Sequence, residues 1–247
     1  MKIPGLLLLV ACGVATPVLA QTPSAARPSS NTPKAGIAVS ASTMGSGGDV
    51  AVRLNDHANF RVGGNLFNLS HDFVDSDNNI TYVGKLSFKS LHAAVDLFPF
   101  RGGFHISPGL VIANKNNVSL AATIAAGTKF DIGDVQYVSG SANPVKASGS
   151  VTVKTVSPAV TIGWGNIVPR SRHFSVPFEL GVVFQGAPTG LLGFTGTVCA
   201  TNGSNCRDIS SDASVKAEVA KQQATLNDDI KFARFYPVLS LGFAFRF

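Results

Sequence analysis

The side chains that could do chemistry in this sequence are few and stand apart from one another. His105 and Ser107 are two residues apart, so in an extended chain both lie on one face. A histidine in that position takes the proton of a serine nucleophile when a carboxylate orients the imidazole ring. No conspicuous carboxylate in the sequence is placed to do so. We therefore expect no catalytic residues.

Isolated charged residues form the second group of interest. Each interrupts a run in which bulky apolar residues alternate with Gly, Ala and Ser, and each falls on the small-residue side. They are Arg53, Arg61, Asp96, Glu179 and Arg246. A charge in a confined place is costly unless it is paired. The pattern predicts an ion-pair network of these side chains, with separate hydration of each charge as the alternative.

Eight extended segments are needed to position these residues. Period-two alternation between turn residues predicts strands. They cover residues 37–42, 50–54, 60–73, 80–98, 104–113, 156–164, 174–185 and 235–247. In the fourth segment the apolar phase slips near Lys89 and Ser90, where we expect a β-bulge.

The two faces of these segments do not suit a soluble sandwich. One face is bulky and apolar, but the other is small rather than charged, and only 14% of the chain is charged against roughly 25% in an average soluble protein. Small residues suit the narrow inside of a closed eight-stranded barrel, and bulky ones suit lipid outside it. We predict an all-β fold, an eight-stranded antiparallel transmembrane β-barrel over residues 35–247.

The N-terminal residues are typical of an exported protein. Lys2, an apolar run and a small-residue cleavage site before Gln21 predict a signal peptide over residues 1–20. A lipoprotein-type cleavage before Cys12 is the alternative. Residues 21–34 are rich in Pro, Ser and Thr and predict a flexible periplasmic leader.

Two long connections separate the predicted strands, about residues 116–150 and 186–234. With both termini in the periplasm, eight strands place these connections outside the cell and three short ones in the periplasm. A short helix is predicted in the second, from apolar residues at helical spacing. These are Val215, Val219, Leu226 and Ile230. We expect it to pack as a lid on loop strands, with a partner-binding helix as the alternative.

The remaining polar loops suggest little metal chemistry. Cys199 and Cys206 flank a short polar stretch and, in an exported chain, predict a disulfide rather than a zinc site. Asp75 and Asp77, near His71 and Asp72, are interpreted as a solvated acidic loop rather than a weak calcium site. No cofactor is expected.

The segments together resemble the small outer-membrane β-barrel proteins of Gram-negative bacteria, the type that includes the OmpA membrane domain, OmpX and OmpW. The resemblance rests on RVGGNLFN, FPFRGGFHISPGLV, GWGN before FELGVVFQG, and the closing YPVLSLGFAFRF. It implies a location in the bacterial outer membrane and a C-terminal signal read by the barrel-assembly machinery. That signal would comprise Leu241, Phe243, Phe245 and Phe247.

Some barrels of this kind are lipid A deacylases with a His-x-Ser pair, which His105 and Ser107 resemble. Here, however, the pair follows a short turn and should lie at the periplasmic end, away from the outer leaflet.

The sequence thus predicts a structural or loop-mediated interaction role. A narrow channel is the alternative, in which the excess of arginine would favour small anions, and a lipid-modifying enzyme is a distant third. The expected partners are outer-membrane lipid, lipopolysaccharide, to which the formal net charge of +6 is suited, and the barrel-assembly machinery. Nucleic acid is excluded, because no basic run with interleaved aromatics occurs. The sequence names no solute and no oligomeric state.

Overall fold

A closed barrel of eight antiparallel strands is the centre of the fold. The structure, a computed structural model, describes residues 34–247 except 78 and 79. The predicted signal peptide, and the predicted leader up to residue 33, lie outside these residues. The wall consists of β1 (Ala35–Ser42), β2 (Gly45–Asn55), β3 (Ala58–Asp75), β4 (Ile80–Leu97), β5 (His105–Asn114), β10 (Ser157–Trp164), β12 (Phe178–Phe184) and β16 (Phe235–Arg246).

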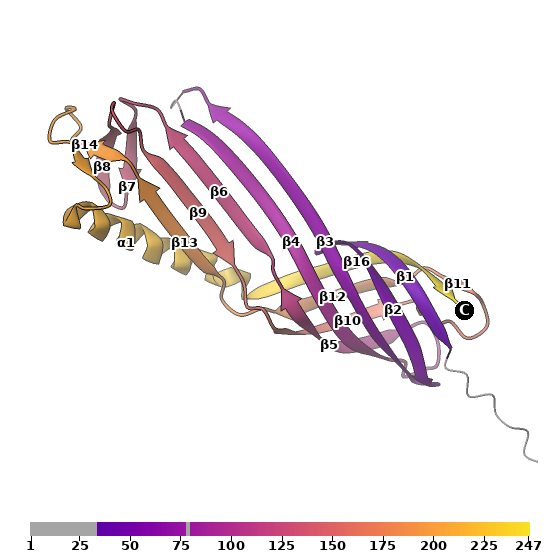
Figure 1. Ribbon diagram of the computed structural model, residues 1–247. Coiled ribbons are helices and arrows are strands. Elements are labelled where there is room, and N and C mark those ends of the chain that lie inside the picture. Colours follow the sequence, from indigo (N-terminus) through magenta and orange to yellow (C-terminus); the bar gives the residue numbers. More distant parts are fainter. Residues whose placement is uncertain (1–33, 78–79) are drawn as a thin grey trace, which may run out of the picture. The chain divides into compact units, whose positions relative to one another are not determined.

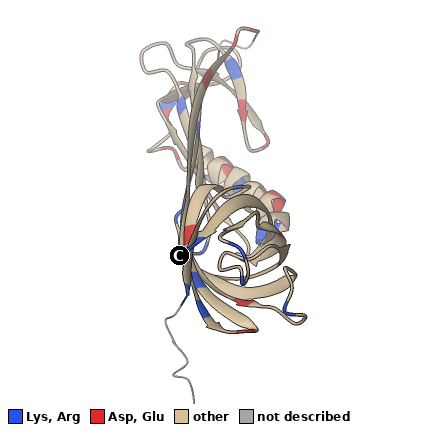
Figure 2. Ribbon diagram, turned by 90° about the vertical axis from the view of Figure 1, so that its right-hand side faces the viewer, with Lys and Arg blue, Asp and Glu red and all other residues tan. Residues whose placement is uncertain are grey.

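Hydrogen-bonded pairs run around the ring in the order β4-β3-β2-β1-β16-β12-β10-β5, and β5 pairs back to β4 to close it (Figure 1). A two-residue strand, β11 (Phe174–Ser175), also pairs with β16. The predicted eight-stranded antiparallel barrel is confirmed. Figure 2 shows the wall as a ring on which charged residues are few.

The outer surface of the barrel carries the large apolar side chains. Val39, Leu91 and Phe243 are 63%, 52% and 68% exposed, whereas the inward residues Ala38 and Ala244 are buried. In water the large side chains would be driven inside and the small ones tolerated outside. The predicted arrangement of bulky residues outside and small residues inside is therefore confirmed.

The two ends of the barrel differ in their connections. At one end, called the base, lie the start of β1, the end of β16 and the short turns β2–β3, β4–β5 and β10–β11. At the other end, called the rim, the two long predicted connections leave the ring. That these connections share one end is confirmed by the strand pairing.

The long connections build a folded extension above the rim. The upper parts of β3 and β4 continue into it and are joined by β6 (Asn117–Ile124), β9 (Lys146–Thr152) and β13 (Thr189–Thr195). A second sheet contains β7 (Lys129–Ile132), β8 (Val135–Ser139), β14 (Thr197–Cys199) and β15 (Arg207–Asp208). The extension also holds helix α1 (Ala213–Asp229) and the 3-10 turn η1 (Ile230–Arg234).

The extension has a hydrophobic core of its own. Its members come from both sheets, the loops between them and α1. They are Ile124, Ile132, Tyr137, Val145, Val198, Ile209 and Val215, with Ile80, Phe130, Phe194 and Val219 packed against them. This part of the chain is thus stabilised by apolar burial of its own.

The β-bulge expected near Lys89 and Ser90 is wrong. β3 and β4 pair in one unbroken register from Ala58 opposite Leu97 to Asp75 opposite Ile80. The irregularity lies instead on the β5 side, where Leu91 pairs with Ala113 but His92 pairs with Val111, leaving Ile112 as the extra residue.

The apolar stripe of β4 changes face because its surroundings change. Without a bulge in β4, Leu86 and Phe88 share the inward face with His92. Within the ring that face lines a narrow bore, and the opposite face is the apolar one. Above the rim the inward face meets the extension instead, and Ile80 packs on its core. The bulky residues therefore move to the side that is covered there.

Helix α1 covers the open edge of the extended sheet, which ends at β13. An uncovered edge would leave backbone groups unpaired. Here the Gly190 amide donates to Asn227 Oδ1 at 2.8 Å and the Leu192 amide to Gln223 Oε1 at 2.7 Å. Gln223 Nε2 donates back to the Gly190 carbonyl. The helix packs on loop strands as a lid, which was the expected arrangement.

The start of α1 is fixed by a side-chain cap. Asp212 accepts hydrogen bonds from the Ser214 and Val215 amides. The Ser214 hydroxyl and the Val215 amide hold the pKa of Asp212 below its ordinary value.

No helix in the described part of the chain combines the length and the apolar character needed to cross a membrane.

A disulfide joins Cys199 to Cys206 in the extension. Cys199 is buried beside Val198 of the extension core.

We predict that replacing both cysteines by serine lowers the stability of the extension by about 2 kcal/mol, since the closed loop is short, and leaves the barrel unchanged. Proteolysis between residues 200 and 206 should accelerate. Urea unfolding of the barrel, followed by the fluorescence of Trp164, should keep its midpoint, and an equal loss in both parts would contradict two separate cores.

Candidate functional site

A buried cluster of charges crosses the middle of the bore. The Arg61 guanidinium contacts Glu179 through its two terminal nitrogens, Nη1 to Oε1 at 2.6 Å and Nη2 to Oε2 at 2.8 Å. Its Nε lies 3.0 Å from Asp96 Oδ1, although the angle is poor for a hydrogen bond. All three side chains are less than a tenth exposed. A bidentate arginine–carboxylate pair is the strongest form of such a contact.

The cluster spans the barrel from one wall to the opposite one. Arg61 stands on β3 and Glu179 on β12, which are four strands apart in either direction around the ring. Hydroxyls from the intervening strands complete the cluster. Ser107 Oγ donates to Asp96 at 2.7 Å, and Thr161 Oγ1 donates to Glu179 at 3.1 Å. The buried carboxylates are thus paired and hydrogen-bonded, as burial of charge requires.

Arg53 and Arg246 lie apart from this cluster, at the base. Arg53 Nη2 donates to the Val168 carbonyl at 2.7 Å. Arg246 Nη1 donates to the carbonyls of Pro169 and Arg170 at 2.6 and 2.7 Å. The structure therefore brings together three of the five residues expected in one network. The other two, Arg53 of β2 and Arg246 of β16, contact the connection between β10 and β11 instead.

That connection enters the bore and closes its base. Residues 166–170 are called the base plug. Its Ile167 and Val168 are almost fully buried against the small inward residues Ala38, Ala51 and Ala244. Asn59 Nδ2 donates to Asn166 Oδ1 at 2.8 Å.

The wall makes room for the base plug at one glycine. A side chain at Gly36 would collide with the Ile167 carbonyl, so the absence of a Cβ there lets the backbone approach.

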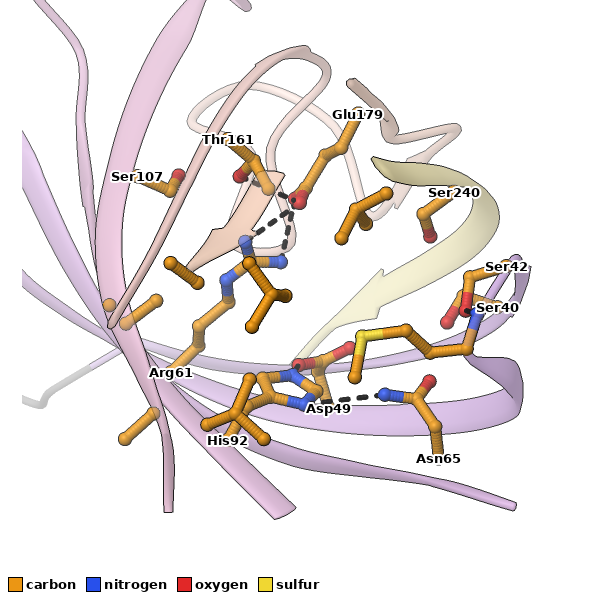
Figure 3. Close-up of a pocket in the computed structure, with 18 of the residues that line it drawn as sticks. Ser40, Ser42, Asp49, Arg61, Asn65, His92, Ser107, Thr161, Glu179 and Ser240 are labelled. Atoms are coloured by element: carbon orange, nitrogen blue, oxygen red, sulfur yellow. Dashed lines mark hydrogen bonds and ion pairs between the residues drawn. The ribbon is translucent and has the colours of Figure 1, made fainter. Parts of the chain in front are cut away.

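A small cavity lies between the charge cluster and the rim (Figure 3). Its volume is about 80 Å³, which is room for a few water molecules, since one needs about 10–15 Å³. Its polar walls include Ser40, Ser42, Asp49, Arg61, Asn65, His92, Glu179 and Ser240.

A second pair, absent from the expected set, faces this cavity. His92 Nε2 lies 2.7 Å from Asp49 Oδ1, and Asn65 Nδ2 lies 3.4 Å from His92 Nδ1. The predicted second strand, residues 50–54, leaves Asp49 out, but β2 begins at Gly45. The alternation of Asp49 with Val50 is the signal that could have found it.

An apolar layer lies on the rim side of the cavity. Met44, Val111 and Val183 are buried together, with Tyr236 and Val238 packed beside them. Met44 belongs to the turn between β1 and β2, and the Tyr236 hydroxyl holds this turn by donating to the Thr43 carbonyl at 2.6 Å. Three layers therefore lie across the bore: the base plug, the charge cluster and this apolar layer.

The His105 and Ser107 pair does not form a nucleophile. Ser107 Oγ donates its hydrogen bond to Asp96 Oδ1 rather than to the histidine. His105 Nε2 lies 3.4 Å from Glu179 Oε1. The expectation that no carboxylate stands near the histidine is wrong, because Glu179 lies two strands away from β5 and reaches it. Both residues are instead part of the buried cluster.

Metal sites are equally unsupported in the described residues. Among them no three His, Cys, Asp or Glu side chains lie together as a metal ion would require. At the expected acidic loop, Asp75 Oδ1 accepts a hydrogen bond from the Asp77 amide at 3.1 Å.

We predict that Arg61→Met destabilises the barrel by about 3–5 kcal/mol, because Asp96 and Glu179 would remain buried without their partner. The matched variant Arg53→Met removes one hydrogen bond at the half-buried base and should cost about 1 kcal/mol. Urea unfolding in detergent, followed by the fluorescence of the single tryptophan, measures both. Equal losses in the two variants would show that the buried cluster has no special weight.

Comparison with known proteins bears on the fold. No protein-family model and no curated protein matches the sequence. Among solved structures, CarO2 of Acinetobacter baumannii aligns over 87% of this chain and 98% of its own, with a TM-score of 0.55 and 19% identity. CarO of the same organism aligns over 86% and 97%, with a TM-score of 0.51 and 20% identity.

A more distant match is a major outer membrane protein of Thermus thermophilus, with a TM-score of 0.30 and 16% identity over 86% of this chain and 99% of its own.

At identities this low, the two CarO structures establish a shared architecture and no activity. The resemblance to small outer-membrane barrels is thereby confirmed at the level of the fold: this chain is a closed eight-stranded barrel of the kind seen in CarO2 and CarO.

Proposed function

We propose that this protein is an integral outer-membrane β-barrel whose bore is closed and which acts through its folded extension outside the cell. The observation that carries the proposal is that three successive layers lie across the bore. The cavity beside the charge cluster has a volume of only about 80 Å³. A barrel closed in this way offers partners its extension rather than a passage.

The outward surface supports a location in a membrane. Large apolar side chains cover the barrel from base to rim, as lipid-facing strands do, and Arg61, Asp96 and Glu179 of the wall point inward. The export signal predicted in residues 1–20 and the shared fold with CarO2 and CarO agree with the outer membrane.

A narrow channel is the second candidate, and the cavity favours it. Movement of Met44, of the charge cluster and of the base plug would join the cavity to both ends. The expected preference for anions is not supported, because Arg53 and Arg246 are engaged by backbone carbonyls at the base. In the middle of the bore, Arg61 faces three carboxylates, of Asp49, Asp96 and Glu179. A catalytic role has no such support, since Ser107 and His105 have separate partners.

Conductance in planar bilayers tests the closed bore. We expect no steady openings from the wild-type protein over many insertions. A variant with Arg61→Ser, Met44→Gly, Ile167→Gly and Val168→Gly loses the cross-brace, the plug side chains and the methionine of the apolar layer, so it should conduct.

The conducting variant also shows that the assay detects barrels inserted in the same way. Steady openings of the wild-type protein would contradict the proposal and support the channel.

The C-terminal residues are proposed as the assembly signal. The Phe247 side chain is 67% exposed, so its burial contributes little to stability. The Phe247 amide donates a hydrogen bond to the Ala35 carbonyl at 3.0 Å, and a substitution of the side chain leaves this bond in place. We predict that Phe247→Ala sharply lowers the amount of protein in the outer membrane of cells. The purified, refolded variant should lose less than about 1 kcal/mol, as exposed substitutions do.

Phe232→Ala is the matched control for this experiment. Phe232 is 80% exposed and lies in η1, so its replacement should leave assembly intact. An equal loss of assembly in both variants would remove the C-terminal signal from the proposal.

A further inference from the structure

Three lysines stand side by side at the rim. Ser90 pairs with Asn114 at the end of the β4–β5 ladder, and the Lys115 amide donates to the Lys89 carbonyl at 2.8 Å, which sets Lys115 opposite Lys89. The Asn114 amide donates to the Thr155 carbonyl at 2.8 Å, which places Lys154, the neighbour of Thr155 in the chain, beside the end of β5 on the other side. The three backbone positions form one row across three neighbouring segments, called the rim lysines.

This row is electrostatically unfavourable as it stands. Like charges directly opposite one another on neighbouring strands destabilise a sheet. All three lysines are exposed, and none forms an ion pair with any carboxylate in the described part of the chain. By contrast, Lys221 and Lys231 are each paired within one turn of helix. The rim lysines therefore lack a counter-charge from the protein.

Their place relative to the apolar surface says where the counter-charge lies. Lys89 is two residues from the outward Leu91, and Lys154 is two residues from the outward Val156; both apolar residues are more than half exposed. Alternation in β4 puts Lys89 on the same outward face as Leu91, and Lys154 lies just before the start of β10. The row thus begins where the lipid-facing surface of the barrel stops, at the level of a membrane's headgroups.

We infer that Lys89, Lys115 and Lys154 form a binding site for the phosphate groups of lipids in the outer leaflet. The inference rests on the proposed location in the outer membrane, with the rim outward. A phosphorylated headgroup supplies the missing negative charge, and its acyl chains lie along the apolar wall below. Free phosphate has the same charge but cannot use that wall.

Lipid binding to the purified barrel tests this site. Lipid A with two phosphates is titrated into the protein in zwitterionic detergent, and bound lipid is counted by native mass spectrometry. Each lysine near an anionic headgroup contributes roughly fivefold in affinity. The triple variant Lys89→Gln, Lys115→Gln, Lys154→Gln should therefore bind lipid A about a hundredfold more weakly.

The matched control removes the same charge elsewhere. Lys129→Gln, Lys146→Gln and Lys216→Gln change exposed lysines of the extension that form no ion pair in the described residues, and this variant should bind as the wild type does. Monophosphorylated lipid A should bind the wild type more weakly than the form with two phosphates, and inorganic phosphate should compete poorly.

Three results would overturn the inference: undiminished binding by the rim variant, an equal loss in the control variant, or full competition by inorganic phosphate. Failure of the proposed location is seen separately and earlier. A wild-type chain that stays folded and dissolved without detergent contradicts the membrane barrel before any lipid is added.

Discussion

The pair between Arg61 and Glu179 is the contact on which the interior of this barrel depends, because it joins strands on opposite sides of the ring. A shift of either strand by one residue would carry its charged side chain to the apolar outer face. The pair therefore fixes β3 against β12, and the hydrogen-bonded ladders between them carry that register to the other six strands. Asp96 is tolerated in the same place only because Arg61 and Ser107 both reach it.

Most of the fold follows from the sequence because a single rule governs the ring. A bulky residue faces out, a small one faces in, and the period of two is easily seen in stretches such as Phe243 to Phe247. The rule fails at Lys89, where the strand leaves the ring and its inward face meets the extension core. The alternation there changes phase without any change in the backbone. Sequence periodicity alone does not distinguish a bulge from a change of surroundings.

The candidate site was predictable only in part, for a different reason. Arg61, Asp96 and Glu179 stand out because charge is rare on small-residue faces. The roles of Arg53 and Arg246 depend on the base plug, which is a turn that folds inward, and a turn has no period from which its direction follows. Ile167 and Val168, apolar residues within that polar turn, were its available sign. Asp49 and His92 meet across two strands that are not neighbours, so only the curvature of the ring brings them together.

Two opposite packing rules thus operate within the same pair of strands. In the ring, β3 and β4 stabilise the fold by pairing buried charge behind an apolar outer surface. In the extension they bury apolar side chains such as Ile80 on the face that was polar below. The packing rule changes where the surrounding medium changes. On the molecule, that level is marked by Ser90, Asn114 and the row of rim lysines that begins at Lys89. On the proposed function, the layers across the bore below this level and the separate core above it let the barrel serve as an anchor, so that changes in the extension need not disturb the cross-braced interior.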